Sequence, residues 1–243
     1  GKVFSSIDLS SGFYHIPIRE KDQQYAAFTV TNLGQYAFRR AIMGMAGAPA
    51  TFSRAVDLML GDLADTISYV DDILVYSRDI KKHLATLKQA LTRLRKAGMR
   101  ANPEKSVFCV REIDYLGSNI TSDGVRPTLD RVEALQKTKA PTTLAGVRQV
   151  LGVFNYMGGF IHNFARKTEP LRRLTRNDAY RKGPMPPGAV KAFEQIKREL
   201  CNRPVVCFVR EGFPLHLYVD FALGDHRGSG SGMGAVLLQE RLD

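Results

Sequence analysis

The chain has 243 residues, of which 44% are hydrophobic, so it is long enough to bury one large core or two small ones. Its 35 Lys and Arg residues outnumber its 24 Asp and Glu residues, and the net charge of +11 favours a polyanionic partner such as nucleic acid. A basic surface kept for solubility is the alternative. Three cysteines without a CxxC pair suggest neither a zinc site nor a disulfide framework, and they suit a reducing compartment. No apolar run reaches the roughly 18 residues of a membrane span.

The first part of the chain predicts a buried strand that ends in an acid. Residues 3–9 form this apolar strand and place Asp8 at its end, and residues 13–18 predict a second, alternating strand. Pro49 then marks the start of a helix, because proline is tolerated in the first turn. The core positions that follow at helical spacing are Phe52, Val56 and Met59.

A hairpin with two acids at its tip is predicted next. Residues 66–77 carry β-branched and aromatic side chains on both sides of Asp71 and Asp72. Residues 79–98 then predict an amphipathic helix that ends at Gly98. Its apolar stripe consists of Leu84, Leu87, Leu91 and Leu94.

The remaining elements change from short strands to helices and back to strands. The pattern first predicts a strand at 115–120 broken by Gly117, a turn at 122–124, and helices at 128–138 and 143–164. A Gly- and Pro-rich linker at 175–188 and a helix at 189–200 follow. The last predicted elements are strands at 215–219 and 233–238, which flank a glycine-rich stretch at 224–232. The helices suggest a small helical subdomain, and the last two strands suggest the beginning of a second α/β domain. We therefore interpret the chain as part of a longer protein.

Paired carboxylates on a hairpin, with a third supplied by a distant strand, suit two-metal phosphoryl transfer. Asp8, Asp71 and Asp72 would bind two Mg²⁺ ions, with Mn²⁺ as an alternative. Like charges about 4 Å apart repel by roughly 4 kcal/mol at an effective dielectric of 20, so such a cluster requires a cation. An isolated Asp-Asp pair in a turn more often reflects ordinary turn chemistry.

Five sequence blocks around these acids resemble one protein family in order and spacing. They are residues 7–15 (IDLSSGFYH), Gly44 with residues 48–52 (APATF), residues 69–77 (YVDDILVYS), residues 115–117 (YLG), and residues 151–156 (LGVFNY) with 160–164 (FIHNF). Together they resemble the reverse transcriptase in the Pol polyprotein of gypsy-type LTR retrotransposons. The resemblance covers nearly the whole chain.

The resemblance implies roles around the incoming nucleotide. Asp8, Asp71 and Asp72 would be the catalytic metal ligands, with the carbonyl of Leu9 as an extra oxygen ligand. The other implied nucleotide-binding residues are the Ser11 and Gly12 amides for the triphosphate, Phe13 as an aromatic gate against the ribose 2′-hydroxyl, and Met43 with Gly44 over the nucleotide. A core aromatic is the alternative for Phe13. Met43 also departs from the aromatic residue or glutamine that is usual before this glycine.

Further roles implied by the resemblance lie outside the nucleotide pocket. Lys105 would protonate the departing pyrophosphate, although a solvated surface lysine is an equal reading. Tyr115, Leu116 and Gly117 match the primer grip, with a structural glycine as the alternative. Asp220 matches the first metal-binding acid of an RNase H domain, but its partner acids are not in the chain, so we expect no RNase H activity from this chain alone.

The fold expected from this resemblance is α+β. It comprises a right-hand polymerase palm with partial fingers at residues 1–120, thumb and connection helices at 121–185, and a truncated RNase H-like α/β segment at 186–243. The expected location is intracellular and cytoplasmic, in virus-like particles, with a nuclear location also open. No membrane partner is expected, and the sequence leaves the oligomeric state undetermined.

The expected function is RNA-directed and DNA-directed DNA polymerase activity on a primed template with deoxynucleoside triphosphates. The fingers segment that normally precedes Asp8 is not part of the chain, so the isolated chain is expected to depend on segments outside it. One alternative is a noncatalytic, nucleic-acid-binding remnant of a retroelement. Another is an RNA polymerase with a related palm, against which Phe13 argues.

Overall fold

The computed structural model describes residues 1–176, 180–208, 214–222 and 232–239. It has an α+β fold and divides into two compact units, Gly1–Val206 and Cys207–Asp243. The second unit contains the antiparallel pair β11 (Leu215–Ala222) and β12 (Gly232–Gln239), as predicted. The glycine-rich stretch predicted between these strands lies outside the described residues. None of the helices in the described ranges has the length and apolar character needed to cross a bilayer.

A four-stranded antiparallel sheet forms the centre of the first unit. Its order is β4 (Thr66–Tyr69), β5 (Asp72–Ser77), β1 (Val3–Asp8) and β6 (Val107–Val110). Both the N-terminal strand and the acidic hairpin predicted from the sequence are therefore confirmed. Successive side chains along β1 and β5 point to opposite faces, so Ile7 and Ile73 contribute to one core and Phe4 and Leu74 to another.

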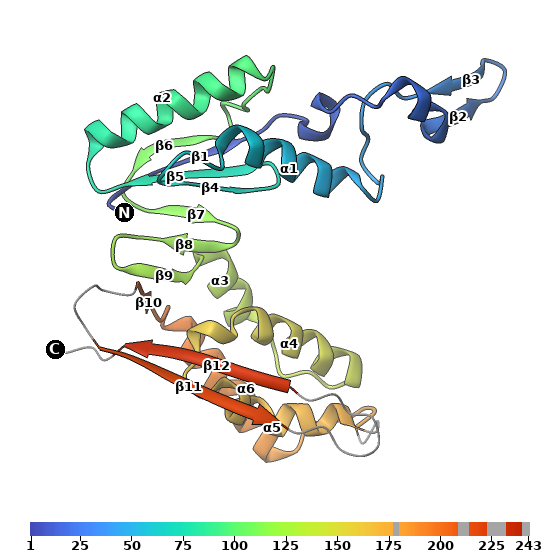
Figure 1. Ribbon diagram of the computed structural model, residues 1–243. Helices are drawn as coiled ribbons and strands as arrows, with labels where there is room; N and C mark the ends of the chain where they lie inside the picture. The colour runs from blue at the N-terminus through green and yellow to red at the C-terminus, as the bar shows by residue number, and fades with distance from the viewer. Residues whose placement is uncertain (177–179, 209–213, 223–231, 240–243) are drawn as a thin grey trace. The chain divides into compact units, whose positions relative to one another are not determined.

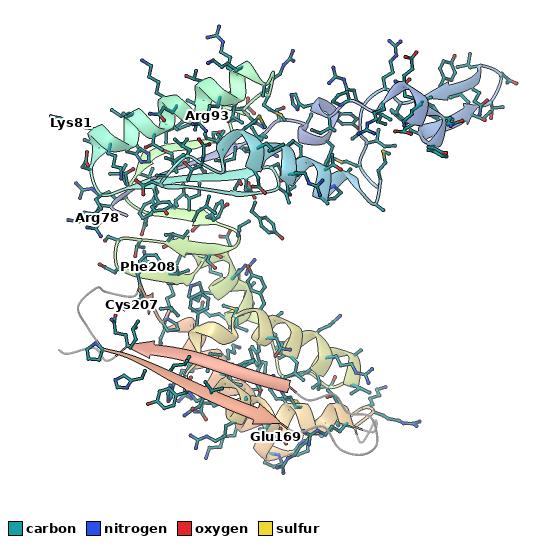
Figure 2. All side chains as sticks on the ribbon, in the orientation of Figure 1. Arg78, Lys81, Arg93, Glu169, Cys207 and Phe208 are labelled. Carbon is teal, nitrogen blue, oxygen red and sulfur yellow. The ribbon has the colours of Figure 1, made fainter. Side chains whose placement is uncertain are left out.

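Two helices cover one face of this sheet (Figure 1): α1 (Ala48–Leu60) and α2 (Ile80–Lys96). Both helices were predicted. The Asp79 side chain caps α2 by accepting a hydrogen bond from the Lys82 N–H at 2.8 Å. Arg93, which is labelled on α2 in Figure 2, joins this helix to the end of α1. Its guanidinium donates to the Met59 carbonyl at 3.0 Å and pairs with Asp62.

The apolar stripe predicted for α2 is only half correct. Leu87 and Leu94 are buried, but Leu84 is 52% exposed and Leu91 is 37% exposed. His83, Thr86 and Ala90 complete the buried face. The packing therefore favours a small residue and a paired polar residue over two of the four leucines.

The segment between Asp8 and α1 differs from the prediction. Gly12–His15 forms a 3₁₀ helix, η1, so the strand expected at residues 13–18 is wrong. A second 3₁₀ helix and a short hairpin, which were not predicted, follow as η2 (Glu20–Ala26), β2 (Ala27–Val30) and β3 (Gly34–Ala37). Nearly every residue of this hairpin is exposed, so it carries no inward-outward alternation that a sequence could display.

A three-stranded meander packs against the other face of the sheet. Its strands are β7 (Ile113–Tyr115), β8 (Ser118–Ile120) and β9 (Gly124–Pro127). Ile113 and Tyr115 enter the core that contains Phe4 and Leu74. The predicted break at Gly117 is a tight turn in which Leu116 and Gly117 have φ of 47° and 72°. A further short strand, β10 (Val206–Cys207), lies where the two units meet in the chain.

Four helices complete the first unit: α3 (Leu129–Lys137), α4 (Leu144–Tyr156), α5 (Phe164–Thr175) and α6 (Pro187–Cys201). The single helix predicted at 143–164 is wrong, because the chain turns through a short 3₁₀ helix, η3 (Gly158–Phe160), and α5 begins after Asn163 at φ 54°. The predicted linker at 175–188 is partly built into the core, since Tyr180 and Met185 are buried.

The helix α6 belongs to the core of the first unit. Phe193, Ile196 and Leu200 are fully buried in the same cluster as Phe154 of α4 and Leu171 of α5. The boundary between compact units therefore falls after Val206, and the domain boundary expected at residue 186 does not coincide with it. The sequence of α6 predicts a helix but not which core the helix joins, and the domain boundary expected at residue 186 stays a prediction.

Candidate active site

The strand register brings two of the three predicted acids together. Asp8, at the end of β1, lies directly opposite Asp72, at the start of β5. Because residues directly opposite in antiparallel strands have Cβ atoms about 4.5–5.5 Å apart, the two carboxylates share one face of the sheet. Asp71 lies in the two-residue connection between the facing residues Tyr69 and Asp72.

The backbone of this turn is strained. Val70 has φ of 54°, a conformation that β-branched residues rarely adopt and that costs on the order of 1–3 kcal/mol. The Leu9 N–H donates to the Asp71 carbonyl at 3.0 Å, so the main chain that follows Asp8 is hydrogen-bonded to the turn. Together these features fix the position of Asp71 relative to Asp8.

The electrostatics of the three acids are those of crowded like charges. Burial raises the pKa of the Asp72 carboxyl, and the charges of Asp71 and Asp8 raise this pKa further, whereas Lys105 lowers it. Among the described residues, however, no group of three or more His, Cys, Asp or Glu side chains is gathered tightly enough to bind a metal ion. The carboxylates are thus close enough to interact but do not converge.

The residues predicted to surround the nucleotide lie directly after Asp8. Ser11 has φ of 55° and precedes η1. Gly12 is buried against Phe52, where an added Cβ would lie 2.6 Å from the ring atom Cζ. Phe13 packs edge-on against the same ring with 5.5 Å between centroids, so it contributes to the core while remaining partly exposed. The gate role of Phe13 stays a prediction.

The predicted primer-grip residues reach the acids from the opposite side. The Tyr115 hydroxyl donates to the Asp72 carbonyl at 3.2 Å, and burial, followed by the charge of Asp72, raises the pKa of Tyr115 to about 12. The Leu116 carbonyl accepts a hydrogen bond from the Tyr156 hydroxyl at 2.7 Å. The Arg131 guanidinium stacks 4.1 Å from the centre of the Tyr156 ring. The turn is therefore tied to both the acidic strand and α4.

The other predicted site residues differ in whether they interact with the acids. Lys105 is exposed and close enough for its charge to act on Asp72. Met43 is 69% exposed and Gly44 has φ of 92°. Asp220 lies opposite Gly234 in the β11–β12 pair, but its side chain falls outside the described atoms.

The sequence did not reveal three residues that hold this site together. Tyr156 was recognised only as part of a block, and Asn102 and Ser106, which hydrogen-bond to the main chain of Asp8, had no predicted role. A polar residue shortly before a strand is too common a pattern to identify a partner about a hundred positions away in the chain.

The chain is similar to known proteins in sequence and in fold. Residues 1–120 match the family described as reverse transcriptase (RNA-dependent DNA polymerase). The Pol polyprotein of the Drosophila melanogaster transposon opus is 33% identical over 98% of the chain, and that of the Drosophila melanogaster transposon gypsy is 30% identical over 98%. The foamy viral protease-reverse transcriptase in complex with an RNA/DNA hybrid superposes with a TM-score of 0.79 at 26% identity, over 98% of this chain and 33% of the viral one.

The chain, through residues 1–120, belongs to the reverse transcriptase family. It spans 24% of the length of each of the two curated polyproteins. Within the family it is a relative of the Pol polyproteins of gypsy-type LTR retrotransposons.

Proposed function

We propose that the protein containing this chain is an RNA-directed DNA polymerase that also copies DNA. It would extend a primer with deoxynucleotides by two-metal nucleotidyl transfer. The observation that carries the proposal is the pairing of Asp8 with Asp72 across two strands, with Asp71 in the strained turn beside them. Membership of the reverse transcriptase family supports the same reaction class.

The acids fit divalent metal ions by their chemistry. Asp8, Asp71 and Asp72 supply hard oxygen ligands of the kind that Mg²⁺ prefers, and Mn²⁺ accepts the same ligands. The pKa of Asp72, raised by burial and by the charges of Asp71 and Asp8, indicates repulsion that a bound cation would relieve. When bound, the ions would supply Lewis acidity for the primer hydroxyl and for the leaving pyrophosphate.

The chain's own residues would then bind and orient the substrates. The amides of Ser11 and Gly12 would bind the triphosphate. The absence of a side chain at Gly12 lets this backbone lie directly against the Phe52 ring. Phe13 would lie under the sugar and exclude a 2′-hydroxyl. Tyr115 and Leu116, tied to Asp72 and to Tyr156, would hold the primer end at the acids.

The lysine beside the acids would act on the leaving group. Lys105 is an exposed ammonium close enough to interact with Asp72 electrostatically. A proton held on its Nζ would pass to the departing pyrophosphate. Met43 and Gly44 would complete the nucleotide pocket from the segment before α1.

Noncatalytic nucleic-acid binding is the alternative. The observation that favours it is that the described carboxylates do not converge into a metal-binding group. The net charge of +11 suits either function, and binding in both cases would weaken steeply with salt. Only an assay of chemistry separates the two functions.

Primer extension on an RNA template with Mg²⁺ tests the proposal. The purified protein that carries the chain should extend the primer, Asp71→Asn should abolish extension, and the matched control Asp123→Asn, in the exposed turn before β9, should not. Phe13→Val should relax the preference for deoxyribonucleotides. Extension that survives Asp71→Asn, or a wild-type protein that binds template without extending, would favour the noncatalytic alternative.

A further inference from the structure

The edge of β1 beside β6 loses its strand partner before it reaches Asp8. The pairing of β1 with β6 runs from Phe4 opposite Val110 to Ser6 opposite Val107, where β6 begins. The N–H and C=O of Asp8 face this edge and lie beyond the start of β6. Because half-buried main-chain groups need partners, another segment must supply them.

The turn from Asn102 to Ser106 supplies both partners. The Asn102 N–H donates to the Asp8 carbonyl at 2.8 Å, and the Asp8 N–H donates to Ser106 Oγ at 3.2 Å. Two residues after Asp8, the Ser10 N–H donates to the Arg100 carbonyl at 2.8 Å. The end of β1 is therefore bound by this segment in place of β6.

The Ser106 hydroxyl has a fixed orientation. Its proton is donated to the Asn102 carbonyl at 2.6 Å, and the Ser106 N–H donates to the same carbonyl at 3.0 Å. The lone pairs of Oγ are thus left to accept from Asp8. The Asn102 side chain also accepts from the Glu104 N–H at 3.1 Å, which stabilises the turn locally. An alanine at position 106 could make neither hydroxyl contact.

The same turn carries Lys105, which is next to Ser106 in the chain. The charge of Lys105 acts on the Asp72 carboxyl. We propose that Ser106 is a positioning residue of the polymerase site: its hydroxyl fixes the main chain of Asp8, and the turn that it closes keeps Lys105 beside the carboxylates. The hydrogen bonds of Ser106 do not depend on the proposed function, whereas their consequence for catalysis rests on it.

Loss of the Ser106 hydroxyl should loosen the main chain at Asp8 while leaving the rest of the fold intact. A neutral hydrogen bond contributes about 1 kcal/mol, so Ser106→Ala should raise the exchange rate of the Asp8 amide proton about fivefold. The affinity for Mn²⁺, used as the probe ion, should fall by a similar factor of about five, because the Asp8 carboxylate is held less firmly. In an active protein the change should lower kcat more than it raises the KM for template.

Three variants of the intact protein test the proposal by NMR amide exchange and by Mn²⁺ titration followed by EPR. Ser106→Ala should show both losses, and Ser106→Thr, which keeps a hydroxyl, should restore both. The matched control Ser68→Ala removes a hydroxyl that donates to the Asp57 carboxylate at 3.0 Å and should change neither.

Unchanged exchange at Asp8 and unchanged Mn²⁺ affinity in Ser106→Ala would overturn the proposal, as would equal losses in Ser68→Ala. Failure of the proposed function has a different signature, because the wild-type protein would not extend primers whatever the exchange data show. If exchange changes in an inactive protein, the hydrogen bond to Asp8 is supported and its catalytic consequence is overturned.

Discussion

Gly12 lies against the ring of Phe52, where an added methyl group has no room. An alanine Cβ would lie 2.6 Å from Cζ and 3.0 and 3.1 Å from the two Cε atoms of this ring. Carbon atoms pack at about 3.5–4.0 Å, so the ring would have to retreat by about 1 Å. Phe52 is fully buried and is packed edge-on by Phe13, so it has no free space to enter. Overpacking of this kind costs about 1–3 kcal/mol, the loss of stability expected for Gly12→Ala.

Urea unfolding of the wild type and four variants measures this cost. Gly12→Ala and Phe52→Leu should each lower the free energy of unfolding, and the double variant should lose about 1 kcal/mol less than their sum, because leucine vacates the space that the methyl group needs. The control Gly152→Ala lies within helix α4, where an added Cβ meets nothing within 4 Å, and should be neutral or stabilising by up to about 1 kcal/mol. A Gly12→Ala protein as stable as wild type, with no coupling to Phe52→Leu, would refute the reasoning.

Two further predictions concern titrating groups. Burial, followed by the charges of Asp71 and Asp8, raises the pKa of the Asp72 carboxyl, so the charged form of this group opposes folding at neutral pH. Asp72→Asn should therefore raise the unfolding temperature of the metal-free protein while weakening Mn²⁺ binding. A lower unfolding temperature would contradict this prediction. His83 is fully buried with Nε2 2.7 Å from Ser5 Oγ, and burial lowers its pKa, so the unfolded chain takes up a proton first as the pH falls below about 6.5. Wild type should therefore lose more stability than His83→Gln between about pH 7.5 and 5.5 in urea titrations, and equal losses would count against the buried neutral state.

The sequence predicted best where a residue's neighbours are local or strictly periodic. The strand before Asp8 and the hairpin around Asp71 follow from short apolar alternation and from turn chemistry, and the structure contains both. The α2 helix was predicted within two residues at each end because Asp79 caps its start and Gly98 follows its end. Such signals are carried by residues a few positions apart.

Predictions failed where tertiary contacts determine which residues are buried and which segments pair. Hydrophobicity favoured Leu84 and Leu91 on α2, but the buried positions went to Ala90 and to His83, which is paired with Ser5 about eighty residues earlier in the chain. The exposed β2–β3 hairpin has no apolar face to display a period. The Ser106 hydroxyl accepts a hydrogen bond from the Asp8 N–H, and no local sequence pattern predicts that contact.

The sequence predicted the three acids as metal ligands, a role that stays a prediction, but it did not predict the contacts that support them. Asp8 and Asp72 lie opposite one another because the antiparallel register aligns two strand ends that each carry an acid. The contacts that hold Leu116 to Tyr156 join segments from different parts of the chain. A single sequence contains no record of such pairings.

Primer extension by Asp71→Asn on an RNA template with Mg²⁺ is the measurement that tests the central claim most directly. The acid lies in the strained turn between β4 and β5, and its amide analogue preserves size and shape while removing the charge. We predict that the variant retains the wild-type fold and template binding and loses detectable nucleotide addition. Extension at the wild-type rate by a folded Asp71→Asn protein would contradict the assignment of these acids as the catalytic centre.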